Sequence, residues 1–453
     1  MYAKPVSAAL SRKAVRRQTV TRTKSTGGTI DSSMQSIDLA YGRTTIPFDF
    51  DPERFDVLCL ESNAKPLSDA EIGNLIDAPI GSPPLEDLMR SGERVLIAVP
   101  DATRRAGAGQ CCNLLIRRLI AAGINPADIR IIFATGIHRP VTESEKNAIL
   151  GDFIARRIVA ESHDSRNIAN LIRLGTTSNG IPIELNRALV DYAFVITISS
   201  VGFHYFAGFT GGRKIICPGL ASTRTITQTH RLAFDFRRKR RADGVAPGRL
   251  EGNPVHEAFV EVASAAAPHF SINTIIGRND EITEMFCGDW MQSHRAACES
   301  FRLSHTIHIK EKRKNVVVSC GGFPYDINMI QAHKALQNAA LACEPGGNII
   351  LIAECPDGAG HTDFAGWFSA GDSDGIAGLL EEKYQVNGQT AWSIRKIAEQ
   401  FNVRIVSSLP AGLTEKMGFA AMQSLSRAVS KLPQGKGYIL PLGARFAIEM
   451  ENN

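Results

Sequence analysis

The sequence lacks the motifs that mark several common classes of protein. Its nine cysteines form no C-x-x-C pair, and Cys111 and Cys112 are adjacent, which suits neither a zinc knuckle nor a disulfide framework. Scattered cysteines of this kind are typical of reduced thiols in a cytosolic protein, so we expect a cytoplasmic location. No apolar run reaches the length of a membrane-spanning helix, and the N-terminus has no apolar stretch of a secretory signal. We therefore expect no membrane segment.

Several nucleotide and metal signatures are also missing. The glycine-rich segment Gly211–Lys214 does not have the G-x-x-x-x-G-K-[ST] spacing of a P-loop, so the sequence gives no reason to infer ATP. The G-x-G-x-x-G fingerprint is absent as well, which argues against an NAD-dependent oxidoreductase. His305 and His308 have neither the i, i+4 spacing nor the acidic neighbour of a zinc-binding helix. We interpret them, and most of the other histidines, as structural.

Net charge is low for a chain of 453 residues, at +5, and it is unevenly placed. Residues 1–26 hold seven Lys or Arg and no acid, and residues 237–241 add five more basic side chains. The remainder is close to neutral, so nucleic acid need not be the main partner. The composition of residues 1–35 predicts a disordered basic tail, although an organellar transit peptide shares it.

The length predicts two or three domains, and a hydrophobic share of 44% is that of an ordinary globular protein. A buried strand at 94–99 is followed by a polar loop, a helix at 110–123, a second strand at 128–136 and another polar loop. Thr142 and Glu145 have the spacing of a capping box at the start of the next helix. This alternation predicts an α/β fold with a mostly parallel sheet.

Two α/β domains are expected, with the active site in the cleft between them. The first, residues 36–308, ends with a hairpin over 270–289 and a helix over 290–302. The second, residues 309–453, begins with the strand 314–322 and continues through a helix at 328–342, a turn at Glu344–Gly347 and the strand 348–355. Further helices are predicted at 373–384, 390–401, 414–422 and 422–431, with a strand at 403–409.

Four loops carry unusual polar residues directly after apolar strands, where open α/β sheets bind their ligands. In the first, Arg104 can hold a substrate carboxylate through two hydrogen bonds. Alternatively, Asp101 caps the next helix and Arg104 pairs on the surface. The second contains His138, a candidate general base or an ordinary loop histidine. The fourth leads into a helix on which Gln331 and Lys334, three residues apart, face the same way. A solvated helix face is the plainer interpretation there, and we assign that role to His333.

The third loop, Gly211–Lys214, follows the buried strand 193–198. Its glycines allow backbone to approach a bulky ligand closely. Lys214 is then either a point charge for an anion or, once desolvated, a nucleophile. His204 lies ten residues before this lysine and His230 sixteen after it, so the segment offers a base and a metal ligand.

These segments resemble the nickel-pincer lactate racemase family. The resemblance rests on residues 200–214, Pro218-Gly219 and His230, on Asp101–Arg104 and Thr135–Arg139, and on Gln331 with Lys334. It extends from about residue 38 to the C-terminus. It implies a racemase or epimerase, an isomerase that inverts the C2 centre of a 2-hydroxy acid by reversible hydride transfer. Proteins that make and insert the cofactor are the implied partners.

The resemblance also implies a role for each matched residue. Lys214 would carry the cofactor, a nickel-pincer nucleotide (a pyridinium-3-thioamide-5-thiocarboxylic acid mononucleotide with nickel), through a thioamide, and His230 would bind the nickel. His138 and His204 would be the acid/base pair. The remaining matched residues would contact the cofactor (Asp101, Gly211 and Gly212) or the substrate (Arg104, Gln331, Lys334 and, by a looser match, Trp392). Ile330 replaces a tyrosine of lactate racemase itself, so the resemblance supports the reaction type rather than lactate as substrate.

One alternative from another class remains open. The basic tail and the run 237–241 are compatible with an anion- or nucleotide-binding regulatory protein that keeps the fold without the cofactor.

Overall fold

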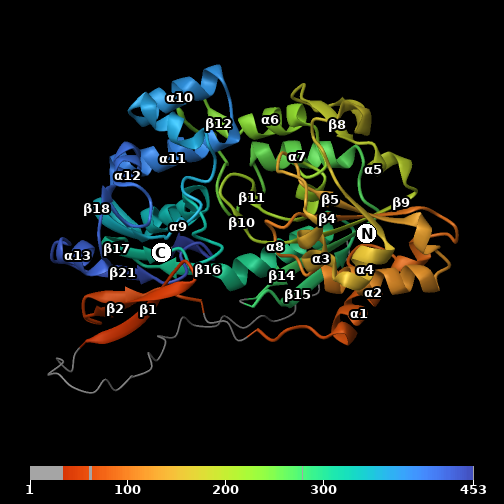
Figure 1. Cartoon of the computed structure of the whole chain (residues 1–453), viewed down its shortest axis with the longest axis horizontal. Coiled ribbons are helices and arrows are strands. Elements are labelled where there is room, and N and C mark those ends of the chain that lie inside the picture. Colours follow the sequence, from red (N-terminus) through yellow and green to blue (C-terminus); the bar gives the residue numbers. More distant parts are fainter. Residues whose placement is uncertain (1–33, 61–63, 278, 452–453) are drawn as a thin grey trace.

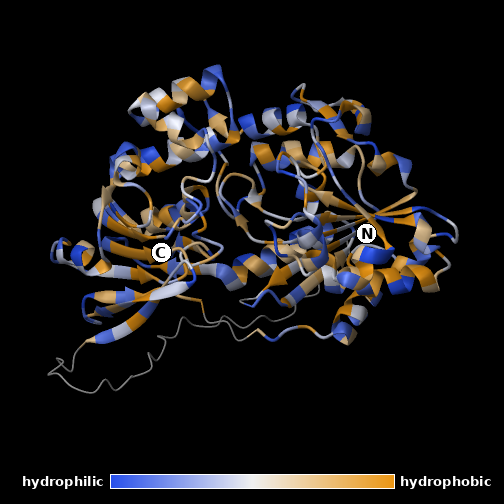
Figure 2. Cartoon of the chain, in the orientation of Figure 1, coloured by the Kyte–Doolittle hydropathy of each residue, from blue (hydrophilic) through white to orange (hydrophobic). Residues whose placement is uncertain are grey.

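Two parallel-stranded lobes lie side by side in the computed structural model, which describes residues 34–60, 64–277 and 279–451 (Figure 1). The predicted basic tail, residues 1–35, falls almost wholly outside the described residues. The strands of both sheets are hydrophobic, whereas the surrounding helices carry hydrophilic residues on their outer faces (Figure 2). That is the pattern expected when helices cover both faces of a parallel sheet. The predicted α/β fold with mostly parallel sheets is confirmed.

The first lobe is built on a six-stranded sheet in the order β15-β14-β9-β4-β5-β6. All neighbouring pairs are parallel except β14 and β15, which form the predicted hairpin. Its strands are β4 (Val95–Pro100), β5 (Ile129–Ala134), β6 (Val159–Ser162), β9 (Phe194–Ser200), β14 (Phe270–Ile276) and β15 (Ile282–Gly288). Its helices are α1 (Asp69–Asp77), α2 (Ala108–Ala121), α3 (Glu143–Leu150), α4 (Asp152–Arg157), α5 (Ala188–Asp191), α6 (Thr223–Arg231), α7 (Pro254–Ser264) and α8 (Gln292–His305).

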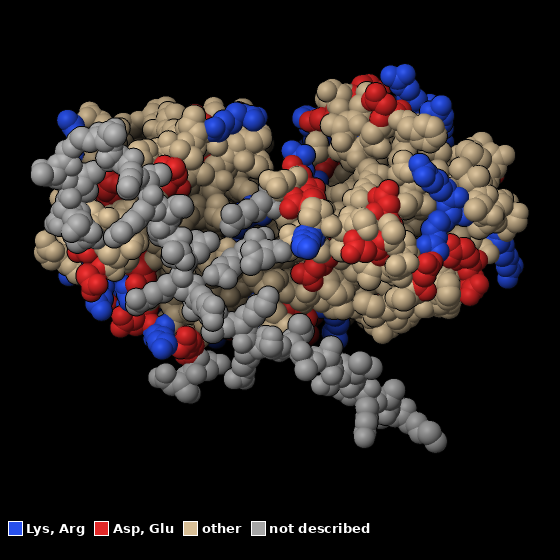
Figure 3. All heavy atoms as spheres, turned by 90° about the horizontal axis from the view of Figure 1, so that it is seen from below, with Lys and Arg blue, Asp and Glu red and all other residues tan. Residues whose placement is uncertain are grey.

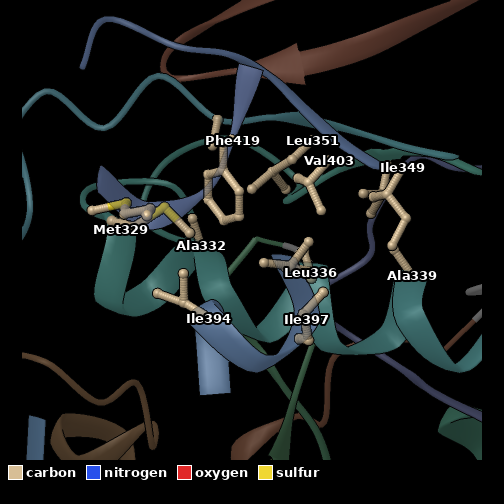
Figure 4. Close-up of a cluster of buried hydrophobic side chains, with 14 of the residues drawn as sticks. Met329, Ala332, Leu336, Ala339, Ile349, Leu351, Ile394, Ile397, Val403 and Phe419 are labelled. Atoms are coloured by element: carbon tan, nitrogen blue, oxygen red, sulfur yellow. The ribbon is translucent and has the colours of Figure 1, made fainter. Parts of the chain in front are cut away.

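The second lobe contains a six-stranded sheet in the order β20-β19-β18-β17-β21-β3, in which every pair is parallel. Its strands are β3 (Phe55–Val57), β17 (Arg313–Ser319), β18 (Cys343–Ile352), β19 (Asn402–Val406), β20 (Ala420–Ala421) and β21 (Gly437–Leu440). Its helices are α9 (Met329–Ala342), α10 (Ser373–Glu382), α11 (Val386–Gln400), α12 (Ala411–Met417) and α13 (Leu425–Ser430). Figure 4 shows how α9 and α11 pack Leu336 and Ile397 against Ile349 of β18 and Val403 of β19.

Short two-stranded sheets complete the fold. They pair β1 (Gln35–Tyr41) with β2 (Thr44–Phe50), β7 (Leu171–Thr176) with β8 (Pro182–Asn186), β10 (Phe203–His204) with β11 (Gly208–Phe209), β12 (Phe234–Asp235) with β13 (Arg240–Arg241), and β16 (Thr306–Ile309) with β22 (Ala447–Met450). The β1–β2 hairpin packs on the second lobe, because Gly42 N–H donates to Asp326 Oδ2 at 2.7 Å.

Some local expectations need correction. The turn expected at Glu344–Gly347 is part of β18, whose pairing with β17 has an irregular register. Strands β21 and β22 follow the last predicted helix and were not anticipated. Strand β3 falls within the range predicted for the first domain but pairs with β21 of the second sheet. By contrast, Thr142 does cap α3, and Glu145 closes the reciprocal capping box.

Candidate active site

The loop after β4 brings Asp101 against His138, which follows β5. Asp101 Oδ2 lies 2.7 Å from His138 Nδ1, while its other oxygen accepts from the backbone N–H and the hydroxyl of Thr103. Burial acts to raise the pKa of Asp101, but these hydrogen bonds outweigh it, and the pKa lies below its usual value. Asp101 is only 6% exposed, whereas the His138 side chain is 51% exposed. The carboxylate thus orients the imidazole and leaves Nε2 available for proton exchange.

His204 lies on the short β10–β11 hairpin that emerges after β9. Its Nδ1 receives long contacts from the backbone N–H groups of Phe206 and Ala207, at 3.5 and 3.3 Å, which leaves Nε2 for other partners. Burial, followed by the positive charges of Lys214 and Arg104, lowers the pKa of His204 well below its usual value. The imidazole is therefore neutral at physiological pH.

Lys214 sits in the 3₁₀ turn η4 (Gly212–Ile215), beside two aromatic rings. Its Nζ lies 4.7 Å from the centroid of the Phe259 ring and 5.7 Å from that of Phe206. Burial, with the charges of Arg213 and Arg104, lowers the pKa of Lys214 well below its usual value. The side chain is nevertheless partly exposed. A lysine whose charged form is disfavoured by burial and whose side chain is accessible is a candidate nucleophile.

His230 faces the same aromatic rings from α6. Its ring centroid is 5.1 Å from Phe206 and 5.3 Å from Phe259. Nδ1 lies 2.7 Å from the carbonyl oxygen of Ile226 and donates to it, so the lone pair is on Nε2. Burial lowers the pKa of His230 to about 3. A neutral imidazole with one fixed tautomer is prepared to bind a metal through Nε2.

Arg213 is buried next to Lys214 and connects the turn to the β10–β11 hairpin. It is 1% exposed, and its guanidinium donates to the carbonyl oxygens of Ala207 at 2.7 Å and Gly211 at 3.3 Å. His294 of α8 packs against the turn so closely that a Cβ on Gly212 would lie 2.4 Å from its Cγ. The Gly212 N–H already donates to Ser199 Oγ at 2.9 Å. The two glycines therefore shape this turn, and their contact with a cofactor remains a prediction.

The second lobe contributes the first turns of α9, which Asn328 caps. Lys334 Nζ donates to Gln331 Oε1 at 2.7 Å, so the two side chains do face the same way. Burial, with the charge of Arg104, lowers the pKa of Lys334 to about 7. A lysine of one lobe thus lies within electrostatic range of an arginine of the other.

The electrostatic neighbours of His204 show that the predicted residues converge. Its imidazole is influenced by Lys214, Arg104, Lys334 and His230, which come from a loop, a 3₁₀ turn and two helices, in both lobes. The charged side chains that lower its pKa, Lys214, Arg104 and Lys334, are all basic. A site with several cations and neutral imidazoles is complementary to an anionic ligand such as a carboxylate or a phosphate.

One predicted residue, His333, lies elsewhere than expected, and Trp392 is buried. His333 was assigned to a solvated face, but it is fully buried, because α9 packs on both α11 and the first lobe; its ring meets Tyr205 edge-on at 4.9 Å. Trp392 is 6% exposed and packs edge-on against Phe234, with 5.0 Å between centroids. Its Nε1 has no hydrogen-bond partner among the described residues. Its contact with a substrate therefore remains a prediction.

The basic run 237–241 is largely neutralised. Arg238 and Arg240 pair with Asp243, Arg238 also with Asp235, and Lys239 with Asp374 of the second lobe. Arg241 turns inward and donates to Ser393 Oγ at 3.1 Å. On the face in Figure 3, basic and acidic side chains are interspersed rather than gathered in a basic field. This run therefore gives little support to nucleic-acid binding.

Three residues that contact the candidate site were not predicted as part of it: Tyr205, Arg213 and Thr390. Tyr205 and Arg213 are within the quoted motif, but only their contacts separate them from ordinary neighbours of His204 and Lys214. Thr390 has no local signal at all. The described residues hold no group of three or more His, Cys, Asp or Glu side chains able to bind a metal unaided. No helix among them is long and apolar enough to cross a membrane.

Comparison with known proteins identifies the family. The family model described as the lactate racemase N-terminal domain matches residues 41–242, and that of the C-terminal domain matches residues 309–438. The lactate racemase of Thermoanaerobacterium thermosaccharolyticum is 31% identical over 339 residues, covering 74% of this chain and 78% of that protein. The lactate racemase of Lactiplantibacillus plantarum is 31% identical over 342 residues, covering 73% and 77%.

Solved structures agree. The lactate racemase apoprotein from T. thermosaccharolyticum superposes with a TM-score of 0.83 and 27% identity, over 91% of this chain and all of that one. A Thermotoga maritima protein, 20% identical over 86% of this chain and all of that one, has a TM-score of 0.64 and shows the fold alone. The chain therefore belongs to the lactate racemase family and is an enzyme of the isomerase class.

Proposed function

We propose that this enzyme inverts the C2 centre of a 2-hydroxy acid, using a nickel-pincer nucleotide attached to Lys214. The observation that supports it best is the convergence of Lys214, His204 and His230 with Arg104 and Lys334 on one site. The relatives are named lactate racemases, so lactate is the first substrate to test.

The chemistry of the site fits the proposed cofactor. Lys214 offers an amine whose lowered pKa favours the nucleophilic form, and His230 offers a free Nε2 for nickel. The rings of Phe206 and Phe259 provide apolar surface beside that amine for a flat pyridinium. Arg104 and the other cations suit the negative charge of the nucleotide and of a carboxylate substrate. When bound, the cofactor supplies a reversible hydride acceptor.

The protein's own residues would bind the substrate and move its hydroxyl proton. Arg104 and Lys334, from opposite lobes, would hold the carboxylate and so fix the C2 centre between them. His138 and His204 would exchange the hydroxyl proton through Nε2. Two such groups are needed because the hydroxyl points in opposite directions in the two enantiomers. Asp101 orients His138, whereas His204 relies on backbone contacts.

Mass spectrometry and metal analysis test this proposal directly. Protein produced together with the cofactor-synthesis and insertion proteins should carry an adduct on the peptide that contains Lys214, and K214A should not. His230→Ala should lose nickel, whereas His138→Ala and His204→Ala should keep it and fail to invert substrate. Chiral chromatography of lactate, malate and longer 2-hydroxy acids measures the inversion. An active preparation in which Lys214 carries no adduct would refute the proposal.

The rival interpretation, a regulatory anion-binding protein, predicts a different outcome. It requires that protein produced together with the cofactor-synthesis and insertion proteins inverts none of these acids, yet binds nucleic acid or nucleotides in a salt-sensitive manner.

A further inference from the structure

Tyr205 is one of the residues through which the two lobes meet beside the site; Gln389 of α11, which donates to the carbonyl oxygen of His230 at 3.1 Å, is another. The Tyr205 ring stacks on the imidazole of His204 at 5.3 Å with an interplanar angle of 12°. The Tyr205 ring also meets the imidazole of His333 of α9 edge-on, with 4.9 Å between the ring centroids and an interplanar angle of 87°. Its hydroxyl lies 3.2 Å from Thr390 Oγ1 of α11. One side chain of the first lobe thus touches both helices that form the second lobe's side of the site.

Arg241 makes a second attachment on the same helix. It donates to Ser393 Oγ at 3.1 Å, and Ser393 lies three residues after Thr390 on one face of α11. Ser393 Oγ also accepts from Gln337 Nε2 at 2.8 Å, and Gln337 contacts His333 at 2.8 Å. The attachment therefore continues from α11 into α9.

The helix held in this way is the one that carries Gln331 and Lys334. His333 immediately precedes Lys334, and His204 immediately precedes Tyr205. The contact between Tyr205 and His333 is therefore one residue from His204, assigned to proton transfer, and one residue from Lys334, assigned to carboxylate binding. Thr390, Ser393 and His333 are all at least nine-tenths buried, so these contacts are shielded from competing water.

We propose that Tyr205 is a positioning residue, which sets His204 at a fixed place relative to Lys334 by bonding to Thr390 of α11. This inference rests on the proposed function and adds to it a reason why the lobes must meet at this point. A substrate whose carboxylate is held partly by the second lobe needs its hydroxyl at a defined distance from His204. The Tyr205–Thr390 bond is the contact that maintains this distance.

Four variants test the bond from both sides. Tyr205→Phe and Thr390→Val each remove it with little change of shape, Y205F/T390V removes both partners, and Thr390→Ser retains the hydroxyl. We expect kcat to fall about fivefold in each of the two single variants, the value of one net hydrogen bond, with no larger loss in the double variant. T390S should keep the kcat of the wild type. Tyr438→Phe is the matched control, because that phenol bonds to the Glu311 carbonyl outside the site.

Hydrogen exchange of residues 386–400 provides a readout that does not depend on turnover. Exchange should rise in Y205F and T390V and stay at the wild-type level in T390S and Y438F. Wild-type kcat and exchange in Y205F, or losses that multiply in the double variant, would overturn the positioning role. If the wild type inverts no 2-hydroxy acid, the proposed function fails instead, while the exchange measurements still decide whether Tyr205 holds α11.

Discussion

Replacing Lys334 by methionine should make the protein more stable while removing a substrate contact. The pKa of Lys334 falls from 10.5 to about 7, chiefly by burial. Keeping the protonated lysine in the folded protein therefore lowers the free energy of unfolding. At roughly 1.4 kcal/mol per pH unit, this difference corresponds to about 5 kcal/mol as an upper bound. Two effects make the stabilisation of K334M smaller than this bound, namely partial exposure of the side chain and loss of the hydrogen bond to Gln331. We expect the free energy of unfolding to rise by about 2 kcal/mol.

The pH dependence gives this prediction its sign. In the unfolded chain Lys334 keeps its proton up to about pH 10.5, whereas in the folded protein it loses it near pH 7. Between these values the unfolded state binds more protons, so wild-type stability rises with pH relative to K334M. The advantage of K334M is therefore largest below pH 7 and vanishes towards pH 10.5.

Urea unfolding of the apoprotein at about pH 6 and about pH 9.5 measures both effects. Lys416→Met, at an exposed position of α12, controls for the loss of a lysine as such. K334M should also raise KM for the substrate, because it removes one of two cations assigned to the carboxylate. A K334M protein no more stable than the wild type at about pH 6 would refute the reasoning, since the lysine would then not be desolvated.

Two further predictions concern the first lobe. Asp101→Asn should lower kcat by about tenfold to a hundredfold with little change in nickel content, because His138 loses the carboxylate that orients it. Because the pKa of Asp101 is lowered, its stabilising effect is present above about pH 4 and is lost as the pH falls through the lowered pKa. Acid unfolding of D101N should therefore lack this loss of stability. If D101N loses stability in acid as the wild type does, the pairing of Asp101 with His138 does not stabilise the fold. Gly212→Ala should cost about 3 kcal/mol in thermal unfolding, because a Cβ there meets His294 and the φ of +53° is strained. Gly180→Ala, with a φ of +76° and no atom within 4 Å, should cost only about 1 kcal/mol, and equal losses in the two variants would show that contact with His294 is unimportant.

Much of the fold was predictable because its signals are local. Buried apolar runs alternate with amphipathic helices, and the polar loops after β4, β5 and β9 were placed by their position after a strand. The capping box of Thr142 and Glu145 depends only on residues three apart. Strand β3 was harder to place, since only pairing with β21, far along the chain, assigns it to the second sheet.

The site divides in the same way. From the sequence alone we could predict candidate site residues, because an amine, imidazoles and basic side chains follow strands, and the carboxyl ends of parallel strands lie at one edge of a sheet. Their roles are those that the family resemblance implies. Only the tertiary structure decided what surrounds them. Burial lowers the pKa of Lys214, and packing between lobes buries His333 and brings Tyr205 to Thr390. These properties depend on contacts between residues distant in sequence, which no local pattern encodes.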